Sequence, residues 1–457
     1  MKVPRIARIT IPARIRQRWR ARLRAQRRWW RERRRGREEA GLLFPAAGKG
    51  MVAVQTLSGD PAAPRPAAAA AAGPRVAILH ASAGNGHQSA ARALAAAFEA
   101  QAPGAIVREV DTLVFASRLY RDTYAASYNA MAARAPALWG VLYHSWAGAR
   151  VNRSTSPVRL AMDRLNLRRL VRVVQGEGAN AVVCTHFLPV EALSPARARG
   201  HLEAPLYCVI TDFTAHPFWA FPHVDRYFVA SEQVAAELAG HGVAREHIEV
   251  TGIPVNPRFA EPIGRAQARA RLGLDGDGPV VLMMGGGQGV GPLAEIADRL
   301  AALPSAPRVA VICGMNQRLR ARVAALPAAH AGRILPVGFT HEVDAWLEAC
   351  DVAVSKAGGL TCSEALIKRV PLVIYKPTPG QEVKNAEYLE AAGAARHADS
   401  AEEVAATVSD WLTHPATLEG LREAAGRIAA PQAAVTIARR VLEGPGARDG
   451  HLTAPQG

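Results

Sequence analysis

The sequence predicts an α/β protein of two Rossmann-like domains, each built on a parallel sheet, that face each other across a cleft. Three observations support this fold class. Short apolar runs alternate with helical patterns from Arg75 onward, as in a doubly wound parallel sheet. The same alternation restarts at Val280. Between the two series, the segment IPVNPRFAEPIG (253–264) contains three prolines and no strand pattern, as expected of a linker.

The expected elements follow this order. Strands are expected in the first half at 75–82, 106–111, 181–186, 205–212, 225–231 and 247–252, and in the second half at 280–285, 308–314, 333–338, 352–358 and 371–377. Helices are expected between them, for example at 87–100, 291–303 and 382–392. We therefore expect an N-terminal Rossmann-like domain over 75–255, a C-terminal Rossmann-like domain over 256–445 and a disordered tail over 446–457. Ligands of such sheets bind beyond the carboxyl ends of the strands, so the loops after the strands should carry the chemistry.

The basic character of the chain is confined to its first residues. Residues 1–50 hold 17 Lys and Arg against three acids, which accounts for most of the formal charge of +17. Residues 1–74 are expected to be a disordered basic tail with an Ala/Pro linker. The tail has three interpretations: an Arg/Trp-rich helix on anionic lipid, a nucleic-acid-binding arm, or an untranslated extension with Met51 as the start. The near-neutral remainder argues against nucleic acid as a partner.

Other compositional features set limits on the class of protein. No run of 18 apolar residues is present, so no bilayer-spanning helix is expected. The five cysteines are scattered without a C-x-x-C pair, and we interpret them as reduced core thiols of a cytosolic protein.

The loop GGGQGVG (285–291) follows an expected strand and precedes an expected helix. Glycines let backbone N–H groups approach phosphate oxygens, and the helix N-terminus adds partial positive charge. The loop lacks the Lys-Ser/Thr of a Walker A motif, which argues against ATP hydrolysis. The alternative is a glycine-rich turn without a ligand. The candidate phosphate-binding residues are Gly285, Gly286, Gly287, Gln288 and Gly289.

The segment SKAGGLTCSEAL (355–366) offers a second close approach to phosphate at Gly358 and Gly359. Glu364, about a turn into the next helix, can accept hydrogen bonds from both ribose hydroxyls. The alternative is a solvated carboxylate on a helix surface.

The segment PTPGQEVKNAEYL (377–389) presents Gln381, Glu382 and Asn385 at the start of a helix. Amides and a carboxylate suit sugar hydroxyls, because each hydroxyl both donates and accepts. Helix capping by polar residues is the alternative.

Two loops in the first half carry candidate catalytic residues. In ASAGNGHQSAARAL (81–94), a glycine turn that includes Gly86 places His87 at the head of a helix. A neutral histidine can act there as a general base, although a lone histidine is more often structural. In TDFTAHPFW (211–219), Asp212 can orient or charge-assist a catalytic histidine, and Trp219 can stack on a glycerol or sugar face. The alternative for this second loop, which also contains His216, is an Asx turn with core aromatics.

No bound metal is expected. Asp275 and Asp277 match a D-x-D pattern, but they lie in the Gly/Asp-rich turn GLDGDGP before a strand. The paired glutamates of retaining transferases are also absent, because Lys356 stands eight residues before Glu364.

Taken together, these segments resemble the monogalactosyldiacylglycerol synthase and processive diacylglycerol glucosyltransferase family, which is related to the lipid II N-acetylglucosaminyltransferase. The resemblance runs from about Arg75 to Val441. It rests on SAGNGHQSAA, TDFTAHPFW, VDRYFVASE, TGIPV, GGGQGVG, SKAGGLTCSEAL and PGQEVKNAEYL in that order. It implies a glycosyltransferase B fold and inverting transfer from a UDP-sugar to a lipid, expected to be diacylglycerol, without a bound metal or other cofactor.

The resemblance also implies roles for the residues named above. His87 is the base or acceptor-positioning residue, Asp212 accompanies it, and Gly86, His216 and Trp219 lie on the acceptor side. In the C-terminal domain GGGQG meets the diphosphate, Phe339 the uracil, Glu364 the ribose, and Gln381, Glu382 and Asn385 the sugar. The expected location is the cytoplasm, peripherally on the inner face of the cell membrane, with an anionic membrane surface as partner. The aromatic stretch 138–148 is either part of an acceptor groove or helix core.

The alternatives are a UDP-sugar transferase with a non-lipid acceptor, a UDP-sugar epimerase or, through the tail, a nucleic-acid-binding protein. The sequence does not determine the sugar, the exact acceptor, processivity or the oligomeric state.

Overall fold

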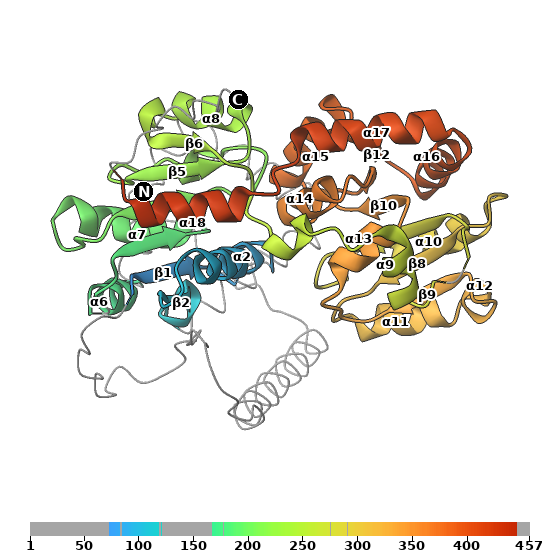
Figure 1. The fold of residues 1–457 in the computed structure, drawn as a ribbon, viewed down its shortest axis with the longest axis horizontal. Helices are drawn as coiled ribbons and strands as arrows, with labels where there is room; N and C mark the ends of the chain where they lie inside the picture. The colour runs from blue at the N-terminus through green and yellow to red at the C-terminus, as the bar shows by residue number, and fades with distance from the viewer. Residues whose placement is uncertain are drawn as a thin grey trace, which may run out of the picture. The chain divides into compact units, whose positions relative to one another are not determined.

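The computed structural model describes residues 73–82, 85–117, 120, 167–176, 178–274, 276–289 and 291–445. Their strands form two six-stranded sheets in which each neighbouring pair is parallel (Figure 1). The predicted fold class is therefore confirmed. The basic tail and the stretch 138–148 lie outside the described residues, and the predicted domain boundaries stay a prediction.

The first sheet has the strand order β2-β1-β3-β4-β5-β6. Helices α2 and α18 cover one face, and α6, α7 and α8 cover the other. The last helix, α18, returns to the first sheet and packs along α2 (Figure 1). The elements are β1 (Arg75–His80), α2 (Asn85–Gln101), β2 (Ile106–Asp111), η1 (Thr112–Val114), α6 (Arg168–Gly176), β3 (Ala181–Cys184), α7 (Phe187–Ala198), β4 (Leu206–Val209), η2 (Pro217–Trp219), β5 (Arg226–Val229), α8 (Glu232–Gly240), η3 (Arg245–His247), β6 (Ile248–Val250) and α18 (Ala433–Glu443).

The second sheet has the strand order β12-β11-β10-β7-β8-β9. One face packs on α9, α13, α14, α15 and part of α17, and the other packs on α10, α11, α12 and α16. The elements are η4 (Pro257–Ala260), α9 (Arg265–Arg271), β7 (Val280–Met284), α10 (Leu293–Ala301), β8 (Arg308–Ile312), α11 (Gln317–Ala324), α12 (Pro327–His330), β9 (Ile334–Val337), α13 (Val343–Ala349), β10 (Val352–Ser355), α14 (Gly359–Ile367), β11 (Leu372–Tyr375), α15 (Gln381–Ala391), β12 (Ala395–Ala398), α16 (Ala401–Thr413) and α17 (Pro415–Ile428).

All eleven predicted strands are present, and most are shorter than their apolar runs. The run 352–358, for example, forms a strand only over Val352–Ser355, so its last residues are free to build the loop beyond the sheet. Strand β12 was not predicted. Its sequence Ala-Arg-His-Ala contains no β-branched or aromatic residue, and pairing with β11 is what holds it in the sheet.

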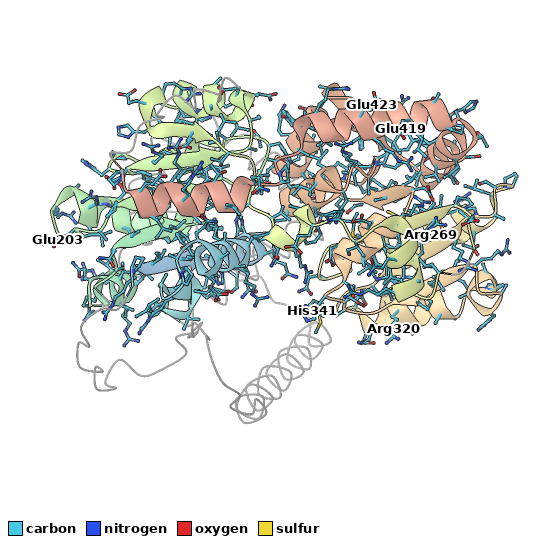
Figure 2. The ribbon with its side chains drawn as sticks, in the orientation of Figure 1. Glu203, Arg269, Arg320, His341, Glu419 and Glu423 are labelled. Atoms are coloured by element: carbon cyan, nitrogen blue, oxygen red, sulfur yellow. The ribbon has the colours of Figure 1, made fainter. Side chains whose placement is uncertain are left out.

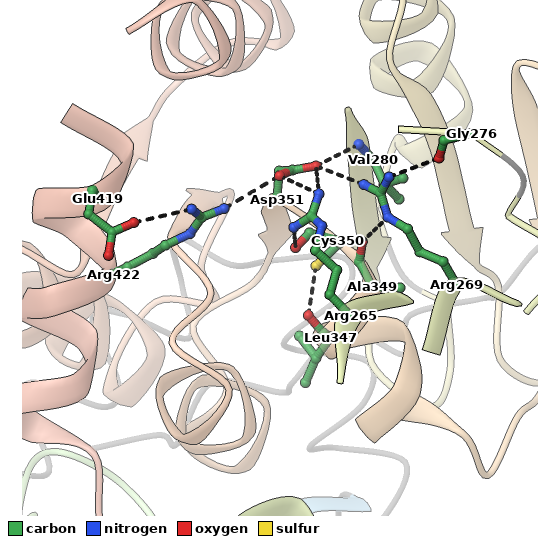
Figure 3. A network of polar contacts seen from close by, with 10 residues as sticks. All are labelled: Arg265, Arg269, Gly276, Val280, Leu347, Ala349, Cys350, Asp351, Glu419 and Arg422. Atoms are coloured by element: carbon green, nitrogen blue, oxygen red, sulfur yellow. Dashed lines mark hydrogen bonds and ion pairs between the residues drawn. The ribbon is translucent and has the colours of Figure 1, made fainter. Parts of the chain in front are cut away.

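Asp351 is the polar centre of the second domain (Figure 3). It lies just before β10 and accepts hydrogen bonds from Arg265 at 2.6 Å, from Arg269 at 3.3 Å and from the Val280 amide at 2.9 Å. Arg422 of α17 donates to it at 3.4 Å. The Arg269 side chain is only 8% exposed and also donates to two backbone carbonyls (Figures 2 and 3). One carboxylate thus joins α9 and α17 to the amino ends of two central strands.

We expect Asp351→Ala to lower the free energy of unfolding by about 3–5 kcal/mol, because it leaves the Arg269 charge buried without its counterion. Glu419→Ala is the matched control: it removes an exposed partner of Arg422 and should cost less than about 1 kcal/mol. Urea unfolding followed by circular dichroism measures both. Equal losses in the two variants would contradict a central role for Asp351.

Candidate functional site

His87 is the third residue of α2 and is partly buried. Its Nδ1 lies 2.7 Å from the carbonyl oxygen of Thr185 and 3.0 Å from the hydroxyl of Thr211. Because a carbonyl only accepts, Nδ1 carries the proton and Nε2 keeps a lone pair. Burial lowers the pKa of His87 to about 4, although the hydrogen bond to Thr185 opposes this shift. The ring is therefore neutral near pH 7 and can accept a proton at Nε2.

Aromatic rings enclose His87 on the first domain. The ring of His186 meets it edge-on with 4.5 Å between centroids, and Trp219 lies at 6.4 Å. Phe187 stacks on His186 at 4.4 Å, while His186 Nδ1 accepts from the Leu188 amide and caps α7. This packing fixes the plane of the His87 ring and excludes water from part of it.

A buried contact between a histidine and a carboxylate lies close to this cluster. His80, at the end of β1, is 3.1 Å from Glu109 of β2, and Gln88 of α2 donates to the same carboxylate oxygen at 3.1 Å. Burial raises the pKa of Glu109, but the hydrogen bonds from His80 and Gln88 outweigh it and lower the pKa overall. The pair joins β1, β2 and α2 beneath the turn that carries His87.

In the second domain, the loop 285–289 is braced by the segment after β8. The carbonyl of Gly287 accepts from the Met315 amide at 3.1 Å, and the carbonyl of Gly289 accepts from Asn316 Nδ2 at 2.9 Å. No hydrogen bond among the described residues uses the amide N–H of Gly287 or Gln288. Carbonyls turned into the protein and amides left available make a cradle for an anion.

The two sets of loops touch. A Cβ on Gly287 would lie 1.8 Å from Asn85 Nδ2, two residues before His87. A Cβ on Gly359, the first residue of α14, would lie 2.0 Å from the carbonyl oxygen of Thr211. Only glycine allows such an approach to a backbone atom. The contacts bring the His87 turn against the loop 285–289 and the N-terminus of α14.

Glu364 lies on α14, and its side-chain carboxyl group has no hydrogen-bond partner among the described residues. Burial raises the pKa of its carboxyl to about 7, Arg258 opposes the shift and Asp344 adds to it. An unpartnered, largely desolvated carboxylate gains free energy from hydroxyl donors, because their hydrogen bonds replace lost hydration.

Known proteins resemble both halves of the chain. Residues 87–255 match the family described as monogalactosyldiacylglycerol (MGDG) synthase, and residues 280–437 match the glycosyltransferase family 28 C-terminal domain. Monogalactosyldiacylglycerol synthase 1 of Arabidopsis thaliana is 30% identical over 392 residues, which cover 81% of this chain and 70% of that protein. Processive diacylglycerol beta-glucosyltransferase of Bacillus mycoides is 32% identical over 286 residues, 62% of this chain and 73% of that protein.

The chain belongs to the monogalactosyldiacylglycerol synthase and processive diacylglycerol glucosyltransferase family. It is a glycosyltransferase. Among solved structures, MurG of Acinetobacter baumannii has a TM-score of 0.52 at 16% identity and covers 81% of this chain and 99% of its own. MnaA of S. aureus, solved with UDP, has a TM-score of 0.53 at 14% identity and covers 80% of this chain and 94% of its own. These likenesses show the glycosyltransferase B fold.

In this glycosyltransferase the predicted site residues fall into two groups. His87, the loop 285–289 and Gly359 come together through the contacts given above, and Gly86 and Gly358 directly precede His87 and Gly359 in the chain. Phe339, after β9, is 55% exposed and lies edge-on to His341, labelled in Figure 2, at 5.0 Å between centroids. An exposed aromatic ring in that loop suits a planar base.

Several of the other predicted residues, unlike Glu364, have protein partners. Glu382 accepts from Lys356 at 3.0 Å and from the Thr378 amide at 2.6 Å. Trp219 is 5% exposed, and His216 Nδ1 accepts from the Phe218 amide at 3.2 Å. Asp212 is hydrogen-bonded to Asn385, and no hydrogen bond among the described residues joins it to His87.

Sequence reasoning missed the residues that orient His87. Thr185 and His186 directly follow β3, and they were included in the predicted strand 181–186. The rule that post-strand loops carry chemistry would have selected them had the strand been ended at Cys184. Lys356 was noted only as a missing glutamate, yet its ammonium group neutralises Glu382 beside the second glycine turn.

The close approach at Gly359 gives a paired test. Gly359→Ala should lower the free energy of unfolding by about 1–3 kcal/mol, because the added methyl group forces Thr211 and α14 apart. Gly358→Ala should change it little, since a Cβ there meets nothing within 4 Å. Thermal unfolding of the two variants compares them. Equal midpoints would show that the two loops do not make this contact.

Proposed function

We propose that the protein transfers a hexose from a UDP-sugar to a lipid hydroxyl, that of diacylglycerol, with inversion at the anomeric carbon. The observation that carries the proposal is the contact of Asn85 with Gly287. It places the turn bearing His87, a neutral base, against a loop with free amides suited to a diphosphate. The names of the relatives, which specify diacylglycerol as acceptor, support the choice of lipid.

The donor is held by the second domain in this proposal. The amides of Gly287 and Gln288 and the N-terminus of α14 meet the diphosphate, whose negative charge favours helix N-termini. Glu364 accepts from the ribose hydroxyls, and Phe339 packs on the uracil. Gln381, the first residue of α15, meets the sugar, and the Lys356–Glu382 pair lies at the same strand ends.

The acceptor hydroxyl loses its proton to His87 as it attacks the anomeric carbon and the C–O bond to UDP breaks. One displacement of this kind inverts the anomeric centre. The bound diphosphate favours the protonated ring, because a nearby negative charge raises the pKa of a histidine. Binding of the donor therefore raises the pKa of His87, which is low in the ligand-free protein.

The proposed place of action is a membrane surface, where a diacylglycerol acceptor resides, on its cytoplasmic side. No helix in the described parts of the chain is long and apolar enough to cross a bilayer. The metal-free transfer expected from the sequence is proposed here as well.

The deciding experiment incubates the protein with UDP-glucose, UDP-galactose or UDP-N-acetylglucosamine and diacylglycerol vesicles, with and without EDTA. Mass spectrometry identifies the glycolipid and NMR its anomeric configuration. A β-linked product that forms in EDTA supports the proposal. If no donor supports transfer, the proposed activity is wrong. Retention of configuration would contradict inversion, and manganese-dependent activity would contradict metal-free transfer.

Glu364→Gln should weaken UDP binding by about 1–3 kcal/mol, because an amide replaces a carboxylate that accepts from ribose. The same change should stabilise the ligand-free protein at pH 8. The folded-state pKa of Glu364 is raised from 4.5 to about 7, so the folded chain retains a proton that the unfolded chain releases between these values. Its ionisation therefore costs stability above pH 7, and glutamine removes that cost.

Calorimetry with UDP and thermal midpoints at pH 5 and pH 8 check the two effects of Glu364→Gln. The gain in midpoint should vanish at pH 5, where the carboxyl group of the folded wild type is already neutral. Unchanged UDP affinity would exclude Glu364 from the donor site.

His87→Ala should lower kcat by about 100- to 10,000-fold, the usual contribution of a general base. UDP affinity should stay near that of the wild type, because the proposed donor contacts belong to the second domain. Turnover, calorimetry and the thermal midpoint of the same preparation separate catalysis from folding. A folded variant with normal turnover would leave His216 or Asp212 as the candidate base.

A further inference from the structure

Asn385 is completely buried in the first turns of α15. Its Nδ2 donates to Asp212 Oδ1 at 3.0 Å and to the carbonyl oxygen of Ala357 at 2.8 Å. Its Oδ1 accepts from the amide of Phe213 at 2.7 Å. Both amide protons of the side chain are thus used within the protein.

These three partners come from both domains. Asp212 and Phe213 follow β4 of the first sheet, whereas Ala357 follows β10 of the second. Tyr388, one turn after Asn385 on α15, stacks on Phe213 with 5.0 Å between ring centroids and 14° between planes. One carboxamide therefore joins the acceptor-side loop to the donor-side strand end.

This geometry does not suit the sugar contact that the sequence predicted for Asn385. A sugar hydroxyl that accepts from Nδ2 would have to displace Asp212 or Ala357 and leave a buried polar group unpaired. Gln381 and Glu382, which are partly exposed on the same helix, remain the candidates for the sugar.

We propose that Asn385 is a positioning residue that holds the Asp212 carboxylate in its catalytic orientation only while the two domains are in contact. The proposal rests on the proposed function. Asn385 engages Oδ1, and Oδ2 has no hydrogen-bond partner among the described residues. That oxygen is left to meet the acceptor hydroxyl or the protonated His87 ring, since Thr211, the preceding residue, contacts His87. Asn385 of the second domain in this way fixes the orientation of the Asp212 carboxylate of the first domain.

The charges around Asp212 make the pH dependence of activity a specific test of the proposal. Burial raises the pKa of Asp212 to about 6, the hydrogen bond from Asn385 opposes the shift, and Glu382 adds to it. Glu382 is paired with Lys356. Further titratable groups on this side are the ring of His87, the phenol of Tyr388 and the thiol of Cys362, which also feels the charge of Glu364. If Asp212 acts ionised, activity is lost as pH falls through its pKa. Loss of the Asn385 donor moves that loss to higher pH.

The test uses Asn385→Asp, which keeps the shape and the acceptor but removes both donors and adds a like charge. We expect kcat for transfer from UDP-sugar to diacylglycerol to fall by about 10- to 100-fold, as for misplaced catalytic groups. KM for the donor should change little, and the acidic limb of the kcat profile should move to higher pH. Tyr388→Leu is the matched control, because it removes the ring stacked on Phe213 but keeps the Asn385 donor to Asp212, and it should keep the wild-type pH profile.

A double-mutant cycle of Asn385→Ala and Asp212→Ala completes the test. In the Asp212→Ala background, Asn385→Ala should have almost no further effect on kcat. Additive effects on kcat would overturn the proposal. So would a raised KM for the donor, which is expected instead of Gln381→Ala, or the same pH shift in Tyr388→Leu.

The same double-mutant cycle, measured by thermal stability, tests the contact between Asn385 and Asp212 independently of enzyme activity. Coupling between positions 385 and 212 in stability supports the contact, and its absence overturns the proposal. An active wild type with an uncoupled cycle refutes only this inference. A folded wild type that transfers nothing refutes the proposed function instead.

Discussion

The close approach of two loop systems at glycine is the constraint on which the site depends. Gly359 lies against the Thr211 carbonyl, and Gly287 lies against the side chain of Asn85. A side chain at either position would need the space that these atoms fill. The parallel order of both sheets makes the approach possible, because it gathers the post-strand loops of each sheet at one edge. Apolar packing of α18 on α2 further ties the end of the chain to the first sheet.

Desolvation follows from that approach and sets the charge state of the site. Burial favours the neutral form of each group: it lowers the pKa of His87 to about 4 and raises those of Asp212 and Glu364 to about 6 and 7. Without a ligand, burial therefore opposes charge on His87, Asp212 and Glu364. Charge is concentrated instead in pairs such as Lys356–Glu382, where each ion has its partner. A nucleotide diphosphate would bring the charge that this site lacks.

Sequence patterns predicted the fold because the central strands of both sheets, such as β1, β3, β7 and β10, are buried and mostly apolar runs, and burial of such runs stabilises the sheets. They also predicted which loops should carry the chemistry, because ligands bind beyond strand ends in this architecture, and that assignment stays a prediction. They could not predict partners across the molecule. Asn385 and Gln381 look alike in sequence, as polar residues at one helix start, yet Asn385 is fully buried and bonded to Asp212. Likewise, only tertiary structure shows that Thr185 and Thr211, which follow two separate strands, orient His87.

The two domains contribute unequal parts of one chemical task, and the polar contacts between them explain how the parts stay matched. His87 takes its orientation from the first domain alone, through Thr185 and Thr211. Asp212 takes its orientation from the second domain, through Asn385, although it belongs to the first. A motion that separates the loops would leave the histidine in place and release the carboxylate. Such a release would expose Asp212 to water and remove its hydrogen bond. In the proposed mechanism the separated protein would then keep the base without the group that stabilises its protonated form, and catalytic competence would depend on domain contact, even though no residue of the first domain needs to change its fold.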